Sequence, residues 1–428
     1  MIAIDTAPAS GRAVCVGFSG GLDSSVLLHR LATEPTLDRS RLRALHVHHG
    51  LHADADDWAA HCRRACDAAG IALQVVRVQV PRDSGLGIEA AARLARREAF
   101  AAALGDAEVL ALAHHRDDQA ETFLMRALRG SGVDGLAAMR PWQAFAGGWL
   151  WRPLLDTARA DLRAHARRHG LDWIEDPSNL DPALDRGFLR ASVLPALRAR
   201  WPHADAALAR SAALAAEAAA LLQDEDARAL ALLEGEDATP GLPIDALLRH
   251  PPARRARLLR AWVATQGLPP LPARGIDRIE QDLLYARDDA GACFAWQDAW
   301  IRRWRGTLHA GRTQAAIPAG WSTRWSGDQP LPLPDGGTLE LVGGAAFQPP
   351  VQVRLRTGGE RIVLPGRRHS HALKQLLQET GIAPWERAGM PLLVDAEGQV
   401  LAAGDRIVSA ALQDWLQARG AHLRWTRR

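Results

Sequence analysis

The sequence predicts an α/β protein whose N-terminal domain is a doubly wound parallel sheet. Across roughly the first 175 residues, short β-branched runs alternate with Ala, Leu and Arg stretches of helical period, which is typical of a parallel sheet covered by helices. The expected strands are 13–19, 42–49, 71–78, 108–114 and 148–155. The expected helices are 22–33, 54–69, 87–104, 117–128 and 157–169. Ligands of such sheets bind beyond the carboxyl ends of the strands, so the residues that follow each strand are the candidates for a site.

The chain is long enough for two or three domains, since it has 428 residues and a domain takes roughly 100–200. An alanine- and leucine-rich stretch at 203–233 predicts a long helix that leaves the first domain. Two passages rich in Pro and Gly, "EDATPGLPI" and "PLPLPDGGTLELVGG", come later. We therefore expect an N-terminal domain at 1–212, a helical middle domain at 213–325 and a small mixed α+β C-terminal domain at 326–428.

The composition indicates a soluble globular protein. Hydrophobic residues make up 47% and charged residues 24%, which excludes wholesale disorder. The chain has no apolar run of about 18 residues and no signal-peptide pattern at its start, so we expect a cytoplasmic protein without a membrane segment. The 4 cysteines are too sparse for a disulfide framework.

The stretch "VGFSGGLDSSVLLHRL" at 16–31 leads from an apolar strand through Ser-Gly-Gly into a helix. Glycines let a backbone approach a phosphate closely, and the first turn of a helix offers unpaired N–H groups at its positive dipole end. A tight turn with capping serines explains the same residues without a ligand. The P-loop pattern of ATPases is excluded, because the stretch has no lysine.

Three other clusters have both a structural and a functional interpretation. His46, His48, His49 and His52 end the second strand, but their spacing fits no common zinc site, and Cys62 and Cys66 are better explained by a packed helix face. Glu89, Arg93 and Arg96 follow one another at helical turns, as on a solvated, salt-bridged face. In "HHRDDQAET", the carboxylates of Asp117, Asp118 and Glu121 lie in the first turns of a helix, where carboxylates often cap the helix.

The motif "SGGLDSS" resembles the S-G-G-x-D-S phosphate loop of the N-type ATP pyrophosphatases. Later stretches are similar to the tRNA(Ile)-lysidine synthase family and come in that family's order. They are "ALHVHHGLHADAD", "GIEAAARLARREAF", "AHHRDDQAETFLMRALRGSGVDGLAAM", "RPLL", "WIEDPSNLDPALDRGFLR" and, near the C-terminus, "RTGGERIVLPGRRHSHALKQLLQETGIAPWERAGMPLLV". The resemblance implies an N-terminal sheet of the adenine nucleotide alpha hydrolase-like type.

The resemblance also implies site residues. The ATP-binding residues would be Ser19, Gly20, Gly21, Leu22, Asp23, Ser24, Ser25 and His46, with His46 contacting adenine through its backbone. The catalytic residues would be Asp23, which organises Mg²⁺, Arg93 and Arg96, which neutralise phosphate charge, and Asp118 and Glu121. Lysine would be bound by Asp118, Glu121 and His115. Contacts with tRNA would come from Arg129, Arg186, Arg190, Arg367, Arg368 and Lys374.

The implied reaction uses ATP to adenylate C2 of the wobble cytidine in a CAU-anticodon tRNA(Ile). Free L-lysine then displaces AMP and gives lysidine, which reads A rather than G. The chain departs from the family at Arg97, where a tyrosine is usual, and at Gly187, where an asparagine is common. A related cytidine thiolase is disfavoured by the lack of a C-x-x-C pair, while a catalytically silent tRNA-binding protein stays an alternative. The sequence leaves open the oligomeric state, a homodimer included, the identity of the general base and the rejection of tRNA(Met).

Overall fold

The computed structural model describes residues 2–81, 83, 87–176, 184–234, 241–286, 292–344 and 346–427. The chain forms two compact units, Met1–Asp224 and Glu225–Arg428. Within the described ranges, no helix is both long enough and apolar enough to cross a membrane.

The first unit contains every strand and helix that the sequence predicts, with ends shifted by a few residues. Its strands are β1 (Val14–Gly17), β2 (Leu42–His48), β3 (Ala72–Arg77), β4 (Val109–Ala111), β5 (Trp142–Phe145) and β6 (Gly148–Trp151). Its helices are α1 (Leu22–Ala32), α2 (Ala55–Ala69), α3 (Ile88–Ala103), α4 (Arg116–Leu128), α5 (Val133–Leu136), α6 (Arg159–Arg168), α7 (Asp185–Phe188) and α8 (Leu194–Arg200), followed by the predicted long helix α9 (Ala204–Glu234), in which the unit boundary falls.

The sheet of this unit has the strand order β3-β2-β1-β4-β6-β5. The pairs from β3 to β6 are parallel, as predicted. The short edge strand β5, which the sequence analysis did not predict, pairs antiparallel with β6. The chain leaves β1 toward β2 on one side and returns to β4 on the other, so the order reverses between β1 and β4. Open α/β sheets bind ligands in the crevice at such a point.

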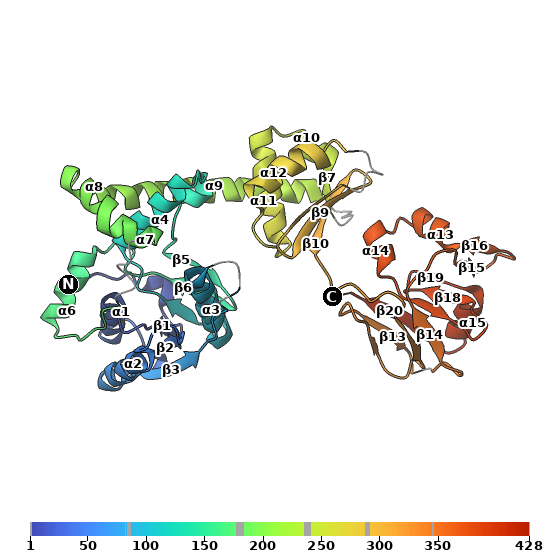
Figure 1. Ribbon diagram of the computed structural model, residues 1–428, viewed down its shortest axis with the longest axis horizontal. Helices are drawn as coiled ribbons and strands as arrows, with labels where there is room; N and C mark the ends of the chain where they lie inside the picture. The colour runs from blue at the N-terminus through green and yellow to red at the C-terminus, as the bar shows by residue number, and fades with distance from the viewer. Residues whose placement is uncertain are drawn as a thin grey trace. The chain divides into compact units, whose positions relative to one another are not determined.

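Helices cover both faces of this sheet (Figure 1). On one face, Val14 and Val16 of β1 pack with Leu27 of α1, Cys62 of α2 and Leu162 of α6. On the other face, Cys15 packs with Phe100 of α3. Because alternate residues of β1 enter two buried layers, the strand is apolar throughout, as expected for a doubly covered parallel sheet.

The second unit begins with helices around a small sheet. The helices are α10 (Ile244–Leu248), α11 (Pro252–Thr265) and α12 (Ala273–Arg278). The strands β7 (Leu242–Pro243), β8 (Cys293–Trp296), β9 (Ala299–Trp304) and β10 (Thr307–Arg312) pair in the order β7-β10-β9-β8. The helices confirm the predicted helical middle region. The small sheet beside them was not predicted. Its strands contain many arginines, tryptophans and alanines and lack the β-branched alternation that makes a strand recognisable.

The rest of the second unit is mixed α+β, as predicted. Its strands are β11 (Ser322–Trp325), β12 (Leu331–Pro332), β13 (Thr338–Val342), β14 (Val351–Arg354), β15 (Arg361–Val363), β16 (Ser370–Ala372), β17 (Leu392–Val394), β18 (Val400–Ala403), β19 (Ile407–Val408) and β20 (His422–Thr426). Its helices are α13 (Leu373–Glu379), α14 (Pro384–Ala388) and α15 (Ala410–Gln417). The largest sheet has the order β11-β14-β17-β18-β19, and a second sheet has the order β12-β13-β20.

Candidate active site

The loop between β1 and α1 is held by backbone contacts on both sides. The amide of Phe18 donates to the Leu45 carbonyl (2.9 Å), and the amide of Ile174 donates to the Gly20 carbonyl (2.9 Å). Gly20 has a φ of +81°, and a Cβ there would lie 2.7 Å from Cδ1 of Ile174 and 2.9 Å from Sγ of Cys62. Glycine is therefore required at position 20 both by backbone conformation and by space.

Helix α1 starts at this loop without a side-chain cap. Its N-cap residue is Gly21, which makes no capping hydrogen bond. The Ser24 and Ser25 hydroxyls instead donate to the carbonyls of Gly21 (3.0 Å) and Gly20 (3.4 Å). The exposed Ser19 hydroxyl lies 3.0 Å from that of Ser24. The capping-serine alternative is thus not what the structure shows, and the amides of the first turn stay available for an anion.

Two predicted ATP-binding residues have buried side chains. Leu22 is part of the hydrophobic core, so only its backbone can contact a nucleotide. The His46 Nδ1 donates to the Phe18 carbonyl (2.9 Å). Burial lowers the pKa of His46, although the bond to Phe18 opposes this. The neutral imidazole therefore supports the strand end just before Ser19, and its predicted contact with adenine would have to come from its backbone.

The cysteines of α2 are buried on its packed face, as predicted. Cys62 and Cys66 are fully covered, and burial raises the pKa of Cys62 to about 12 and that of Cys66 to about 11. Their thiols are therefore protonated and unreactive at neutral pH. Among the described residues, no group of three or more His, Cys, Asp or Glu side chains is arranged to hold a metal ion.

Helix α4 starts beside the loop, at the end of β4, with a reciprocal cap. The His115 Nδ1 accepts from the Asp118 amide (3.4 Å), and the Asp118 Oδ2 accepts from the His115 amide (3.1 Å). Asp117 has a different role. Its Oδ1 accepts from the Arg159 amide at the start of α6 (3.0 Å), and its Oδ2 accepts from Arg198 of α8 (2.8 Å). Asp117 therefore connects three helices. In Asp118 only Oδ2 takes part in the cap, and Oδ1 faces the candidate site.

That oxygen faces Arg190, which binds two carboxylates of α4. Its Nη2 donates to Asp118 Oδ1 (2.9 Å) and Glu121 Oε2 (3.0 Å), and its Nε donates to Glu121 Oε1 (2.5 Å). Burial raises the pKa of Glu121 although Arg190 opposes the shift. The pKa of Asp118 is lowered, because His115, His114, the His115 amide and Arg190 outweigh its burial. Arg190 was predicted to contact RNA, and here its guanidinium is bound to the predicted lysine-binding pair.

His115 connects this pair with the glycine loop. Its Nε2 lies 3.6 Å from Asp23 Oδ2 and 3.4 Å from Asp118 Oδ2. Burial disfavours the imidazolium, but the Asp23, Asp118 and Asp117 carboxylates outweigh it and raise the pKa of His115. The loop aspartate and the acidic pair thus lie on either side of one buried histidine, although 95 residues separate Asp23 from Asp118 in the chain.

The other oxygen of Asp23 suits a magnesium ion bound to phosphates. Asp23 Oδ1 is buried and accepts no hydrogen bond from the described residues. Arg159 Nε is its nearest ion-pair partner, at 3.9 Å. Mg²⁺ in nucleotide sites is usually held by one or two carboxylates together with phosphate oxygens and water. One orphaned carboxylate oxygen at the phosphate loop fits this pattern.

A group of arginines lies near the acidic pair, with the Glu89 carboxylate as a counter-charge that acts on Arg93. The pKa values of Arg93 and Arg96 are lowered by surrounding protein and by neighbouring cations, with Arg186 acting on both. Both side chains are nevertheless exposed, so they are surrounded by protein on most sides and still open to solvent. Arg93, Arg96 and Arg186 form no hydrogen bond or ion pair with a described residue. A cluster of arginines with few counter-charges attracts anions.

Sequence reasoning missed Arg152 at the end of β6, which contacts His114, a residue expected close to the lysine-binding carboxylates. Arg152, within the quoted stretch "RPLL", directly follows β6, and its Nε donates to His114 Nδ1 (3.3 Å). Burial lowers the pKa of His114 to about 3 and that of Arg152 to about 10, and nearby arginines add to the shift of Arg152. Both residues lie within the predicted strands 108–114 and 148–155, which end earlier in the structure, so only the observed strand ends place them at the edge where ligands bind.

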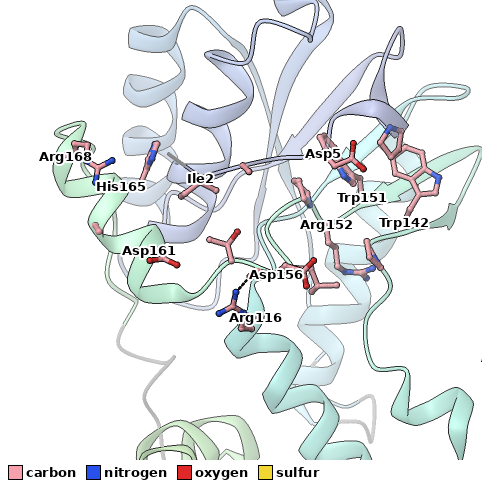
Figure 2. A pocket seen from close by; sticks show the side chains of 17 residues that line it. Ile2, Asp5, Arg116, Trp142, Trp151, Arg152, Asp156, Asp161, His165 and Arg168 are labelled. Carbon is pink, nitrogen blue, oxygen red and sulfur yellow. Dashed lines mark hydrogen bonds between the residues drawn. The ribbon is translucent and has the colours of Figure 1, made fainter. Parts of the chain in front are cut away.

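A pocket of about 700 Å³ lies on the other side of Arg152 (Figure 2). It is lined by the start of the chain, by α6 and by the turn after β6, where Arg116 donates to the Asp156 carbonyl. No residue of the glycine loop and neither Asp118 nor Glu121 lines it. This pocket therefore borders the candidate site through Arg152 and is separate from the loop.

The predicted RNA contacts are distributed over both units. Arg129, at the end of α4, is exposed and pairs with Asp185 (3.3 Å). Arg367, Arg368 and Lys374 are exposed in the second unit. Within the quoted stretch "WIEDPSNLDPALDRGFLR", residues 177–183 lie outside the described residues.

A glycine-rich loop that runs from a parallel strand into an uncapped helix, at the point where the strand order reverses, defines a nucleotide-binding PP-loop protein. Residues 3–197 match the PP-loop domain family. Residues 242–309 match the TilS substrate binding domain, and residues 351–425 match the TilS substrate C-terminal domain.

Relatives match the chain along nearly its whole length. It is 58% identical over 414 residues to the tRNA(Ile)-lysidine synthase of Xanthomonas campestris pv. campestris (strain 8004). The aligned region covers 96% of this chain and 94% of that protein. The enzyme of the same name from Xylella fastidiosa (strain Temecula1) is 56% identical, with 98% and 96% covered. That of Salmonella agona (strain SL483) is 44% identical, with 94% of each chain covered. The chain belongs to the tRNA(Ile)-lysidine synthase family, which confirms the resemblance found in the sequence.

Proposed function

We propose that this protein ligates free L-lysine to C2 of the wobble cytidine in tRNA(Ile) with a CAU anticodon. In the first step, the C2 oxygen of the cytidine attacks the α-phosphate of ATP, the bond between the α- and β-phosphates breaks, and pyrophosphate leaves. In the second step, the ε-amine of lysine attacks C2, the bond from C2 to oxygen breaks, and AMP leaves. The amine loses a proton, and the product is lysidine, which reads AUA instead of AUG.

The observation that carries this proposal is the position of the acidic pair beside the phosphate loop. The uncapped start of α1 suits the phosphates of ATP, and His115 lies between Asp23 of that loop and Asp118. Buried carboxylates are natural counter-charges for an ammonium group. An adenylated base and a lysine side chain bound at these two places would therefore lie next to each other.

Each remaining residue has a role that follows from its environment. Ser19 and the amides from Gly20 to Ser24 would hold the departing pyrophosphate, and Asp23 would hold Mg²⁺, which supplies positive charge to the phosphates. Arg93 and Arg96 would neutralise phosphate charge, because neither is paired with a described residue. Asp118 and Glu121 would recognise lysine, and one of them would take the proton that the attacking amine releases.

The rest of the chain would bind the tRNA. Support comes from the matches to TilS substrate domains at 242–309 and 351–425, which fall within the proposed middle (213–325) and C-terminal (326–428) domains, as the PP-loop match falls within 1–212. Arg129, Arg186, Arg367, Arg368 and Lys374 would contact phosphates. A cytoplasmic location is also part of the proposal.

The test is incorporation of radiolabelled lysine into unmodified CAU-anticodon tRNA(Ile) in the presence of ATP and Mg²⁺. Wild-type protein should label this tRNA, and Asp23→Ala and Asp118→Asn should lose incorporation while keeping a native circular dichroism spectrum. Asp117→Asn is the matched control, because Asp117 joins helices and does not contact Arg190. This variant should lose stability but keep lysine incorporation. Absence of label with the wild-type protein, beside an active control enzyme, would refute the proposal.

A further inference from the structure

Arg190 covers the two carboxylates to which we assign lysine. The Glu121 side chain is 2% exposed and that of Asp118 is 11% exposed, whereas that of Arg190 is 23% exposed. Both oxygens of Glu121 and the free oxygen of Asp118 accept hydrogen bonds from its guanidinium. The solvent side of the acidic pair is therefore occupied by a cation that belongs to the protein itself.

An ammonium group and this guanidinium would compete for the same oxygens. A carboxylate has free lone pairs beyond those that Arg190 uses, but the near-complete burial of Glu121 leaves little room to approach them from another direction. The imidazole of His115 occupies another side of the pair, with its Nε2 3.4 Å from Asp118 Oδ2. A further cation added to an occupied pair would face repulsion at short range.

Arg190 is placed where it can leave the pair without unfolding a helix. It lies in η4 (Leu189–Val193), a π-helical turn between α7 and α8, and such turns are often found at functional sites. Its side chain has several rotatable bonds and reaches the carboxylates from the solvent side. Rotation about these bonds would release both carboxylates and return the guanidinium to water.

We infer that Arg190 is an internal competitor that holds the cation position of Asp118 and Glu121 until the ammonium group of lysine displaces it. This inference rests on the proposed assignment of lysine to this pair. It makes Arg190 a residue that sets the apparent affinity for lysine and keeps other small cations away from the empty site. An arginine that occupies the pair for about 90–99% of the time raises the apparent Kd for lysine by about 10- to 100-fold.

The direct test compares lysine binding to wild-type protein and to Arg190→Gln by titration calorimetry at pH 8. Arg190→Gln should bind L-lysine at least about tenfold more tightly. Arg198→Gln is the matched control, because it removes a guanidinium of α8 that pairs with a different α4 carboxylate, that of Asp117 (2.8 Å). This control should bind lysine as the wild type does. Equal or weaker binding by Arg190→Gln would overturn the inference.

A second measurement uses guanidinium chloride at low millimolar concentration as the probe, with sodium chloride at equal ionic strength as its control. The vacated position in Arg190→Gln should accept a guanidinium ion, so guanidinium chloride should weaken lysine binding to this variant and not to the wild type. Equal effects of both salts on the variant would contradict displacement.

If Arg190→Gln does not fold, Arg190→Lys replaces it as the variant in the lysine-binding test. A lysine keeps the charge but contacts the pair through one nitrogen, so the affinity for free lysine should rise by a smaller factor than for glutamine. Unchanged affinity would overturn the inference and leave the proposed function intact. Failure of the wild type and all variants to bind lysine would contradict both the inference and the lysine assignment.

Discussion

Substitution of Gly20 by alanine tests how tightly the structure confines the phosphate loop. The φ of Gly20 is +81°, and an L-residue in this region costs about 1–2 kcal/mol. The new Cβ would lie 2.7 Å from Cδ1 of Ile174 and 2.9 Å from Sγ of Cys62, and overpacking of this kind costs about 1–3 kcal/mol. Alanine also restricts the unfolded chain, which returns about 0.4–1 kcal/mol. The expected net loss of stability is about 1–5 kcal/mol.

Gly11→Ala is the control that separates these contributions. Gly11 has a φ of +71°, and a Cβ there would meet nothing within 4 Å. It shares the backbone strain and lacks the crowding, so Gly20→Ala should lose about 1–3 kcal/mol more than Gly11→Ala. The assay is urea denaturation of the full-length protein followed by circular dichroism. Equal losses in the two variants would show that Ile174 and Cys62 do not confine the loop, and the packing argument would fail.

Three further predictions concern the core, pH and magnesium. Leu27 is fully buried, so Leu27→Ala should lower the free energy of unfolding by about 2–5 kcal/mol; a loss below about 1 kcal/mol in urea denaturation would contradict this core assignment. The folded-state pKa of His114 is about 3 and that of an unfolded histidine is about 6.5. Between about pH 3 and pH 6.5, therefore, this histidine binds a proton in the unfolded state and not in the folded state. The free energy of unfolding of the wild type should fall as pH decreases below about 6.5, by up to about 1.4 kcal/mol per pH unit. His114→Asn should lack this contribution, and parallel stability curves for the two proteins from pH 6.5 to 5 would refute it. Removal of Mg²⁺ with EDTA should weaken ATP binding by the wild type, measured by calorimetry, and Asp23→Asn should respond less; an equal response would exclude Asp23 as the residue that holds the ion.

The sequence determined the parallel strands and the longer helices of the first unit and the position of its phosphate loop. These features depend on local properties, namely the period of apolar residues and the glycines that follow a buried strand, and they can be recognised without knowing what lies nearby. Even the candidate residues Asp23, Asp118 and Glu121 could be found in this way, since each lies in the first turns of a helix that follows a predicted strand. The strands of the middle sheet escaped recognition because arginines and alanines interrupt their aromatic and β-branched residues, so no alternation with a period of two stands out.

Only the tertiary structure decided what each charged side chain contacts. Asp117 and Asp118 are chemically identical neighbours, yet one joins α6 and α8 and the other faces Arg190, 72 residues away. His115 lies between Asp23 and Asp118 because β1 and β4 are adjacent in the sheet although far apart in the chain. Arg190 could be predicted as a functional arginine, but its role at the acidic pair depends on where α7 and α8 fold back. Such pairings arise from contacts between distant segments, which no local pattern of residues records.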